Sequence, residues 1–397
     1  MKRAKAWQNF CAAPMMLALA SCVGNPTAPQ TVVSVGPMIG EPTTPNEFAG
    51  ATILNVDRYR PTRTMPSCKT SELPHSEADH ALQSALSQAQ EYSTSQNGVG
   101  LIVLQNGAVV HSEFAEGAGP TTLTSSASMM KSVLGLTVGI ALERGIITSI
   151  DDPVGDSISE WQDDPRGAII MRDLLTMSSG LAPLSFSEFL LAPDANAAAL
   201  NSQIAEEAGN TFYYNNVVSQ LIGLILDRRV KAHGYAGYAE FLYSELWCPL
   251  GNGEARLWVD STGMPRTYAG LHAGLEDWAR IGELIRNKGR AGDRQIVPAS
   301  WVEQMSAPSP ANPRYGFQLW RAGGWEAQRS YNPDNPMKVI HSAPFAASDL
   351  VFFDGFGGQR VYVIPSVGLT IARTGDVSFQ FDDAQIPNPL VSALSQQ

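Results

Sequence analysis

The sequence has little charge and no extended basic run, and this narrows its possible partners. Charged side chains make up 16 % of the 397 residues, and 38 acidic against 27 basic residues give a net charge of −11. An acidic surface repels a phosphate backbone, so we do not expect nucleic acid as a partner. Hydrophobic residues make up 44 % of the chain, which is typical of a globular protein.

Other absences exclude membrane-spanning helices and several kinds of active site. No stretch stays apolar over the roughly 20 residues that a transmembrane helix needs. No G-x-S-x-G motif occurs, which disfavours an α/β-hydrolase fold. His75 and His80 lie beside Glu77 and Asp79, but their spacing matches no zinc pattern. We therefore expect neither a metal site nor a cofactor.

The N-terminus has the features of a removable leader. A basic segment, "MKRAKAWQNF", precedes an apolar segment that is too short to span a bilayer. The following "LASC" resembles the lipobox of bacterial lipoproteins, in which the cysteine carries the lipid. We expect a signal peptide over residues 1–21 and lipidation of Cys22, which would anchor the protein to a membrane of the bacterial cell envelope, facing the periplasm or the exterior. The alternative is a plain secretory signal that happens to contain Cys22.

The chain has only four cysteines, and two of them lie beyond this leader and its lipid site. These two, Cys68 and Cys248, can form a disulfide outside the cytoplasm. The sequence does not show whether they lie close together, so the pairing stays open.

Composition divides the chain into a tether and one folded domain. Residues 23–50 hold five prolines and four glycines without any periodicity, which is typical of a linker. We predict a flexible tether over residues 22–74 that begins at the lipidated cysteine, and a folded domain over residues 75–397.

Several elements of this domain can be predicted from local patterns. We expect a helix over residues 76–93 capped by Ser76, helices through most of residues 126–290, and a short closing helix at the C-terminus. Hairpins are expected over residues 98–114, with Asn106–Gly107 at the turn, and over residues 357–375. Strands near both ends with helices between them indicate an α+β fold: one antiparallel sheet flanked by helices, with an inserted all-helical subdomain.

Ser128 and Lys131 carry the strongest chemical signal. They stand three residues apart in "SASMMKSVLG", at the start of a helix that is apolar all round, so their side chains emerge on the same side. Burial of an unpaired ammonium is costly and lowers the pKa of a lysine. A neutral lysine could then take the proton of the serine hydroxyl and activate it as a nucleophile. The alternative is a helix-capping serine with a lysine that reaches water.

A second motif, "YYNNVVSQLIG", precedes another apolar helix. Tyr214 and Asn216 fit a Y-x-N pattern, in which the tyrosine would act as a phenolate or carry a proton to the leaving group. The asparagine would orient the lysine and hydrogen-bond a substrate carbonyl. An alignment that starts at Tyr213 competes with this one. Taken by itself, the Y-x-N motif could equally be an aromatic core residue followed by a helix cap.

Six segments together resemble the serine β-lactamase-related hydrolases. In chain order they are "SMMK", "LERGIITSIDDPVGD", "IIMRDLLTMSSGL", "YNNVVSQLIG", "QIVPASWVEQM" and "FGGQRVYVIPSVGLTIARTG". The sequence looks most like 6-aminohexanoate-dimer hydrolases and similar esterases, which are related to class C β-lactamases and penicillin-binding proteins. The resemblance covers roughly residues 75–395 and implies the β-lactamase/transpeptidase-like fold, with the active site between the sheet and the helical subdomain.

The resemblance also implies roles for individual residues. Ser128 would be the acylated nucleophile, Lys131 its base, and Tyr214 the second acid/base group. We prefer Tyr214 to Tyr213 because the family places a glycine nine residues after the tyrosine, and Gly223 satisfies that spacing. Asn216 would be the last residue of Y-x-N.

The third family motif, K-T-G or H-x-G on a strand, is altered in this sequence. Its counterpart is Phe353-Asp354-Gly355, which keeps the glycine but has neither lysine nor histidine. We expect the backbone N–H of Phe356 to pair with that of Ser128 as an oxyanion hole.

The resulting prediction is a lipid-anchored serine hydrolase that cleaves small esters or linear amides through an acyl-enzyme. The missing cation of the third motif disfavours β-lactams and D-Ala-D-Ala peptides, which remain the first alternative. A catalytically silent, lipid-tethered binding protein is the second. His272 lies in a segment that the family runs close to the site, and it is a weaker candidate for substrate contact.

Overall fold

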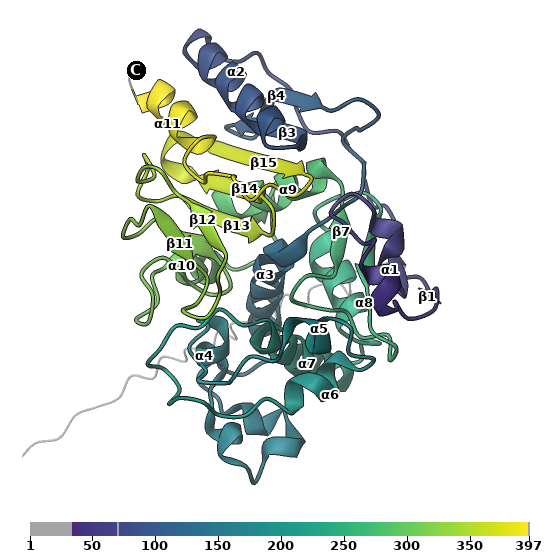
Figure 1. The fold of residues 1–397 in the computed structure, drawn as a ribbon. Coiled ribbons are helices and arrows are strands. Elements are labelled where there is room, and N and C mark those ends of the chain that lie inside the picture. The colour runs from purple at the N-terminus through teal and green to yellow at the C-terminus, as the bar shows by residue number, and fades with distance from the viewer. Residues whose placement is uncertain (1–33, 70, 396–397) are drawn as a thin grey trace, which may run out of the picture. The chain divides into compact units, whose positions relative to one another are not determined.

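The computed structural model describes residues 34–69 and 71–395, and its main feature is a six-stranded antiparallel sheet (Figure 1). In spatial order its strands are β10 (Trp320–Arg321), β13 (Val351–Gly355), β14 (Gln359–Ile364), β15 (Leu369–Gly375), β3 (Gly98–Gln105) and β4 (Ala108–Phe114). The pairing of β15 with β3 joins the C-terminal strands to the N-terminal ones. The prediction of a sheet assembled from both ends of the domain is confirmed.

Both predicted hairpins are present, and their turns have the expected backbone. Asn106 and Gly107, between β3 and β4, have φ values of 51° and 87°. Positive φ at both central positions is typical of the tight turn whose twist matches that of the strands. The second hairpin joins β14 to β15 through the 3₁₀ turn η7 (Pro365–Val367), and Gly368 closes it at φ 67°.

Helices cover the sheet on both faces. The helix α9 (Leu275–Arg286) approaches closely at Gly282, where an added Cβ would lie 2.8 Å from Val361 and 2.6 Å from Thr370. Arg373, three residues after Thr370 on β15, points to the opposite face and donates to the carbonyl of Gln96, directly after α2 (His80–Ser95). The closing helix α11 (Pro387–Ser395) packs beside α2, as Figure 1 shows.

The start of α2 corrects one prediction. Asp79 caps the helix, because its side chain accepts the N–H of Ala81, and Ser76 does not. The N–H of Ser76 donates instead to the carbonyl of Val109, so the chain there runs extended along β4. A local sequence pattern cannot predict a pairing between residues so far apart in the chain.

The helical region lies below the sheet in Figure 1, with α3 (Met130–Glu143) between the two. The residues of α3 are buried on nearly every side, in agreement with apolar positions all round the helix. The other helices of this region are α4 (Met171–Leu175), α5 (Phe186–Leu190), α6 (Ala195–Leu200), α7 (Asn216–Ala232), α8 (Tyr238–Leu242) and the π-helical turn η6 (Tyr243–Trp247).

A second sheet corrects the prediction of a single one. In spatial order its strands are β1 (Met38–Ile39), β2 (Thr62–Met65), β6 (Ala255–Trp258), β7 (Leu271–Ala273) and β5 (Thr124–Ser125). The strands β6 and β7 lie in the segment expected to be mostly helical. Because β5 ends just before Ser128, this sheet also positions the start of α3.

The same sheet shows that much of the predicted tether is folded. Within residues 22–74, β1, the helix α1 (Pro45–Phe48), the 3₁₀ turn η1 (Val56–Arg58) and β2 are ordered elements, and β2 pairs with β6. A disulfide between Cys68 and Cys248 closes the question that the sequence left open. The predicted signal peptide and Cys22 lie outside the described residues.

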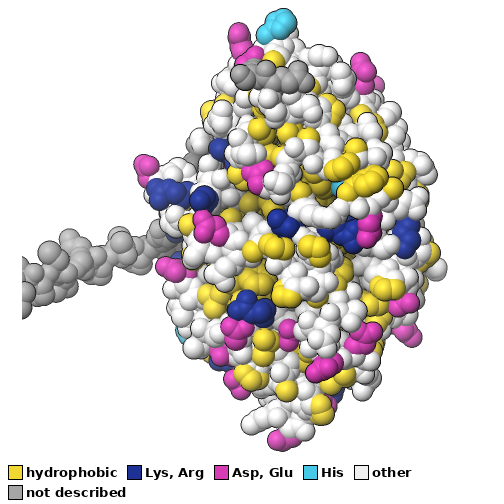
Figure 2. Space-filling model, turned by 90° about the vertical axis from the view of Figure 1, so that its left-hand side faces the viewer, with side chains coloured by type: hydrophobic (Ala, Val, Ile, Leu, Met, Phe, Trp, Pro, Cys, Tyr) yellow, Lys and Arg dark blue, Asp and Glu magenta, His cyan; other side chains and the backbone are white. Residues whose placement is uncertain are grey.

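The remaining elements are short. They comprise the hairpins β8 (Arg290–Ala291)–β9 (Arg294–Gln295) and β11 (Gln328–Ser330)–β12 (Lys338–Ile340), the helix α10 (Ala299–Ser306), and the 3₁₀ turns η2 (Ala127–Met129), η3 (Val154–Asp156), η4 (Ser159–Trp161) and η5 (Pro165–Ala168). Among the described residues no helix is long and apolar enough to cross a membrane. Basic side chains on the face in Figure 2 lie among acidic and hydrophobic ones.

Candidate active site

Ser128 lies on the turn η2, between the end of β5 and the start of α3. The preceding residue, Ala127, has a φ of 44°, which is unfavourable for a residue with a Cβ. Hydrogen bonds hold the turn: the N–H of Ser126 donates to the carbonyl of Leu271, and its hydroxyl donates to that of Ala269. Backbone strain held by its surroundings is typical of functional positions.

Lys131 lies one helical turn further along and is 1 % exposed. Its Nζ is 2.9 Å from the Oγ of Ser128, 2.8 Å from the Oδ1 of Asn216 and 3.0 Å from the carbonyl oxygen of Tyr268. The structure therefore brings together the serine, the lysine and the asparagine that the sequence singled out.

The surroundings of Lys131 favour its neutral form near pH 7. Burial lowers the pKa of the amine to about 7, and the charge of Asp354 opposes this shift. A neutral amine has two N–H donors and one lone pair. Because Asn216 Oδ1 and the Tyr268 carbonyl can only accept, they engage both donors, and the lone pair is left facing the hydroxyl of Ser128.

Tyr214 completes the group, and the competing alignment at Tyr213 is not supported. The centre of the Tyr214 ring lies 4.8 Å from the Nζ of Lys131, and its hydroxyl interacts with Ser128. Tyr213 instead donates its hydroxyl to Asp334. Burial raises the pKa of Tyr214, the charge of Asp354 adds to the rise, and Ser128 opposes it. Tyr214 therefore carries its proton at neutral pH, which favours proton donation and disfavours the phenolate.

The start of α7 explains why the two neighbouring asparagines differ. Asn215 caps the helix, since its side chain accepts the N–H of Val217 and donates to the carbonyl of Leu181. Asn216 is thereby left to face Lys131. Further along α7, Gly223 permits close packing, because an added Cβ would lie 2.4 Å from the Oγ1 of Thr267. This contact places the carbonyl of Tyr268, the next residue, within reach of the lysine.

The end of β13 lies directly against the serine turn. A Cβ on Gly355 would come within 2.6 Å of the Ser126 carbonyl oxygen, so only glycine fits there without displacing the turn. Three buried side chains hold the carbonyls of the following loop: Arg360 donates to Gly355, Gln359 to Phe356, and Arg373 to Gly358. The backbone orientation at Phe356 is thus constrained on both sides, which suits a fixed N–H donor.

The altered third motif places a carboxylate in a buried ionic cluster. Asp354 accepts from Arg329 at 2.6 Å and from Arg360 at 2.7 Å. Asp383 contacts the same two arginines, each at 2.8 Å. All four side chains are at most 4 % exposed, and their charges balance. The strand therefore presents no free cation at this position, in contrast to the K-T-G pattern.

Three contributors to the site escaped the sequence analysis. The Tyr268 carbonyl has no side-chain signature, and Tyr331, whose ring centre is 5.3 Å from that of Tyr214, lies in no motif. The ionic cluster was predictable only in part: Asp354 stands in the altered third motif and Arg360 in the "FGGQR" segment, but no pattern joined them to Arg329 and Asp383.

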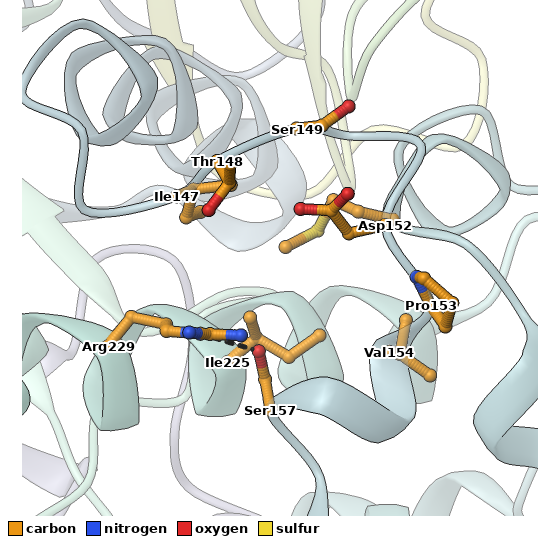
Figure 3. A pocket seen from close by; sticks show the side chains of 10 residues that line it. Ile147, Thr148, Ser149, Asp152, Pro153, Val154, Ser157, Ile225 and Arg229 are labelled. Carbon is orange, nitrogen blue, oxygen red and sulfur yellow. Dashed lines mark hydrogen bonds between the residues drawn. The ribbon is translucent and has the colours of Figure 1, made fainter.

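The weaker candidate for substrate contact, His272, lies outside the site. His272 is fully buried in β7 with its ring 4.7 Å from that of Tyr59, and burial lowers its pKa to about 3, so it is a neutral core residue. A pocket elsewhere, shown in Figure 3, lies between the 147–157 segment and α7, and none of the predicted catalytic residues lines it. The described residues contain no cluster of three or more potential metal ligands.

Comparison with known proteins agrees with this architecture. The family model "Beta-lactamase" matches residues 82–384. A solved structure assigned provisionally as a 6-aminohexanoate-dimer hydrolase from Bacillus anthracis superposes with a TM-score of 0.65 at 17 % identity, over 88 % of this chain and 92 % of that one. No curated protein shows significant sequence similarity.

Two further solved structures share the fold. A penicillin-binding protein homologue from Caulobacter crescentus has a TM-score of 0.58 at 16 % identity, over 82 % of this chain and 98 % of its own. A family VIII carboxylesterase has a TM-score of 0.59 at 13 % identity, over 82 % of this chain and all of its own. With the family match over most of its length, the chain belongs to the beta-lactamase family of serine hydrolases, which includes esterases and amidases.

Proposed function

We propose that the protein hydrolyses small esters or linear amides through an acyl-enzyme on Ser128. One observation carries the proposal: a buried lysine with a pKa of about 7 lies 2.9 Å from the serine hydroxyl, with both of its N–H donors engaged elsewhere. This arrangement supplies a base of suitable strength at the distance that proton transfer requires. The third motif favours such substrates over β-lactams, because Asp354 and its arginines leave no free cation there.

The reaction would proceed in two steps, acylation of Ser128 and hydrolysis of the acyl-enzyme. The Oγ of Ser128 attacks the substrate carbonyl carbon while its proton passes to the Nζ of Lys131, and the N–H groups of Ser128 and Phe356 hold the developing oxyanion. As the carbonyl re-forms, the bond to the leaving group breaks, and Tyr214 donates a proton to it and recovers one from Lys131. Water then attacks the acyl carbon, Lys131 takes its proton, and the acid is released as Ser128 regains its hydrogen.

Covalent labelling tests this proposal and locates the nucleophile. A soluble form that begins after Cys22 should gain the mass of one fluorophosphonate adduct, and peptide mapping should place the adduct on Ser128. The same preparation should hydrolyse p-nitrophenyl butyrate faster than the β-lactam nitrocefin. Absence of both an adduct and turnover would favour the binding-protein alternative, and efficient nitrocefin turnover would favour the β-lactamase one.

The pH dependence of kcat/KM should report the ionisation of Lys131. Because only the neutral amine accepts the serine proton, kcat/KM on p-nitrophenyl butyrate should fall as the pH drops below about 7 and level off above it. The rate is followed at a wavelength where p-nitrophenol and its anion absorb equally. A flat profile between about pH 5 and about pH 9 would contradict the role of Lys131 as base.

The proposal includes attachment to a membrane of the cell envelope through lipid on Cys22. The "LASC" ending of the leader supports it. Full-length protein expressed in a bacterial host should incorporate an alkyne-labelled fatty acid and sediment with membranes. The Cys22→Ser variant should do neither, whereas labelling that survives the substitution would place the lipid elsewhere.

A further inference from the structure

A groove borders the catalytic group on the side of the β11–β12 hairpin. The residues that line it are Tyr331, Met337, Lys338, Val339, Phe356, Gly357, Gly358, Arg360, Ser378, Phe379 and Phe381. Two of them connect it to the site. Phe356 follows Gly355, which touches the serine turn, and the ring of Tyr331 lies beside that of Tyr214.

The walls of this groove are apolar and open to solvent. Met337, Phe356 and Phe379 are 40 %, 38 % and 66 % exposed, and they are three of the eight exposed large hydrophobic side chains of the described chain. The rings of Phe356 and Phe379 pack edge to face, with their centres 5.8 Å apart. Such a concentration of exposed apolar surface beside a reactive serine suits the apolar part of a substrate.

One cation in the groove has no acidic partner. Lys338 is exposed, and its Nζ contacts the hydroxyl of Ser330, the residue opposite on β11, at 2.6 Å. No carboxylate within the described ranges forms an ion pair with it, whereas Arg360 in the same groove is engaged by Asp354 and Asp383. Two donors of the Lys338 ammonium therefore remain available to an anion.

We propose that this groove binds the part of the substrate remote from the scissile bond, and that it selects an apolar chain that ends in a carboxylate, bound by Lys338. This inference rests on the proposed function of Ser128 and names its substrate class. The apolar walls take the chain, and Lys338, at the start of β12 in the hairpin that lines the groove, binds the carboxylate.

Matched ester pairs test the selectivity. The first pair places the carboxylate on the acyl side: anionic mono-p-nitrophenyl adipate is compared with neutral p-nitrophenyl hexanoate. The second pair places it on the alcohol side: anionic 4-butyryloxybenzoate is compared with its neutral methyl ester. Lys338→Gln should lower kcat/KM for the anionic member of at least one pair by about fivefold and leave the neutral member within about twofold, as expected for a solvent-exposed ion pair. Added salt should shrink the difference.

A control and a binding measurement complete the test. Lys288→Gln removes a lysine that pairs with Glu303 and lines neither the groove nor the site. It should leave the ratio of kcat/KM between the anionic and the neutral ester unchanged in both pairs. In the Ser128→Ala protein, ligand-observed NMR should detect binding of hexanoate that Lys338→Gln weakens. Unchanged ratios in both pairs together with Lys338-independent hexanoate binding would overturn the inference. Lys338-dependent binding without any ester turnover would support it while rejecting the proposed function.

Discussion

Lys131→Met should lower kcat/KM on p-nitrophenyl butyrate by about 10³–10⁴-fold. Methionine has a similar length and suits a buried position, but it has no lone pair that can accept the serine proton. Without that base, the hydroxyl of Ser128 attacks from its protonated state, and the remaining rate should approach that of Ser128→Ala. Initial rates of p-nitrophenol release for the three proteins at one pH provide the measurement.

Two controls separate loss of the base from loss of the fold. Lys288→Met makes the same substitution at a surface lysine that pairs with Glu303, and it should retain the parent rate. A thermal melting curve similar to the parent's shows that the Lys131→Met protein is folded. If that folded variant keeps more than about a tenth of the parent activity, Lys131 is not the base that activates Ser128.

Asp383→Ala should lower the free energy of unfolding by about 3–5 kcal/mol. The carboxylate contacts both Arg329 and Arg360 in the interior, and its removal leaves two buried guanidinium groups with only Asp354 to balance them. An uncompensated buried charge is costly because the interior does not solvate it. Urea unfolding at pH 7, followed by tryptophan fluorescence, gives the difference between variant and parent.

Asp151→Ala is the matched control for this stability experiment. Its carboxylate also pairs with an arginine, Arg172, but the aspartate side chain is 56 % exposed, so the cost should stay below about 1 kcal/mol. Equal losses in the free energy of unfolding for the two variants would show that burial of the cluster does not raise the cost of removing one of its carboxylates.

The same cluster predicts how acid affects stability. Although burial opposes ionisation, Arg360 and Arg329 hold the pKa of Asp383 below the ordinary carboxyl value of 3.8. A depressed pKa in the folded state contributes stability that is fully present above the unfolded value and lost as the pH falls through the folded one. The difference in the free energy of unfolding between the parent and Asp383→Ala should therefore be fully present at neutral pH and shrink only below about pH 4.

The parts of the fold that were predictable depend on neighbours close in sequence. The Asn106–Gly107 turn needs only two residues that tolerate positive φ, and the pairing of Ser128 with Lys131 needs only one turn of helix. Predictions failed where a distant partner decides the structure. Residues 22–74 were predicted to be a flexible tether, but β2 within them pairs with β6, nearly 200 residues later in the chain.

The sequence by itself determined the chemical groups of the site and the local elements that carry them. The choice of Tyr214 over Tyr213 rested in the sequence on the spacing to Gly223, and the position of the Tyr214 ring beside Lys131 agrees with it. Only the tertiary structure decided that the Tyr268 carbonyl engages the second N–H of the lysine, and that Asp354 belongs to a buried ionic cluster. The reason is physical. Helix periodicity and turn geometry are short-range, whereas the desolvation that lowers the pKa of Lys131 exists only once separate segments pack around it.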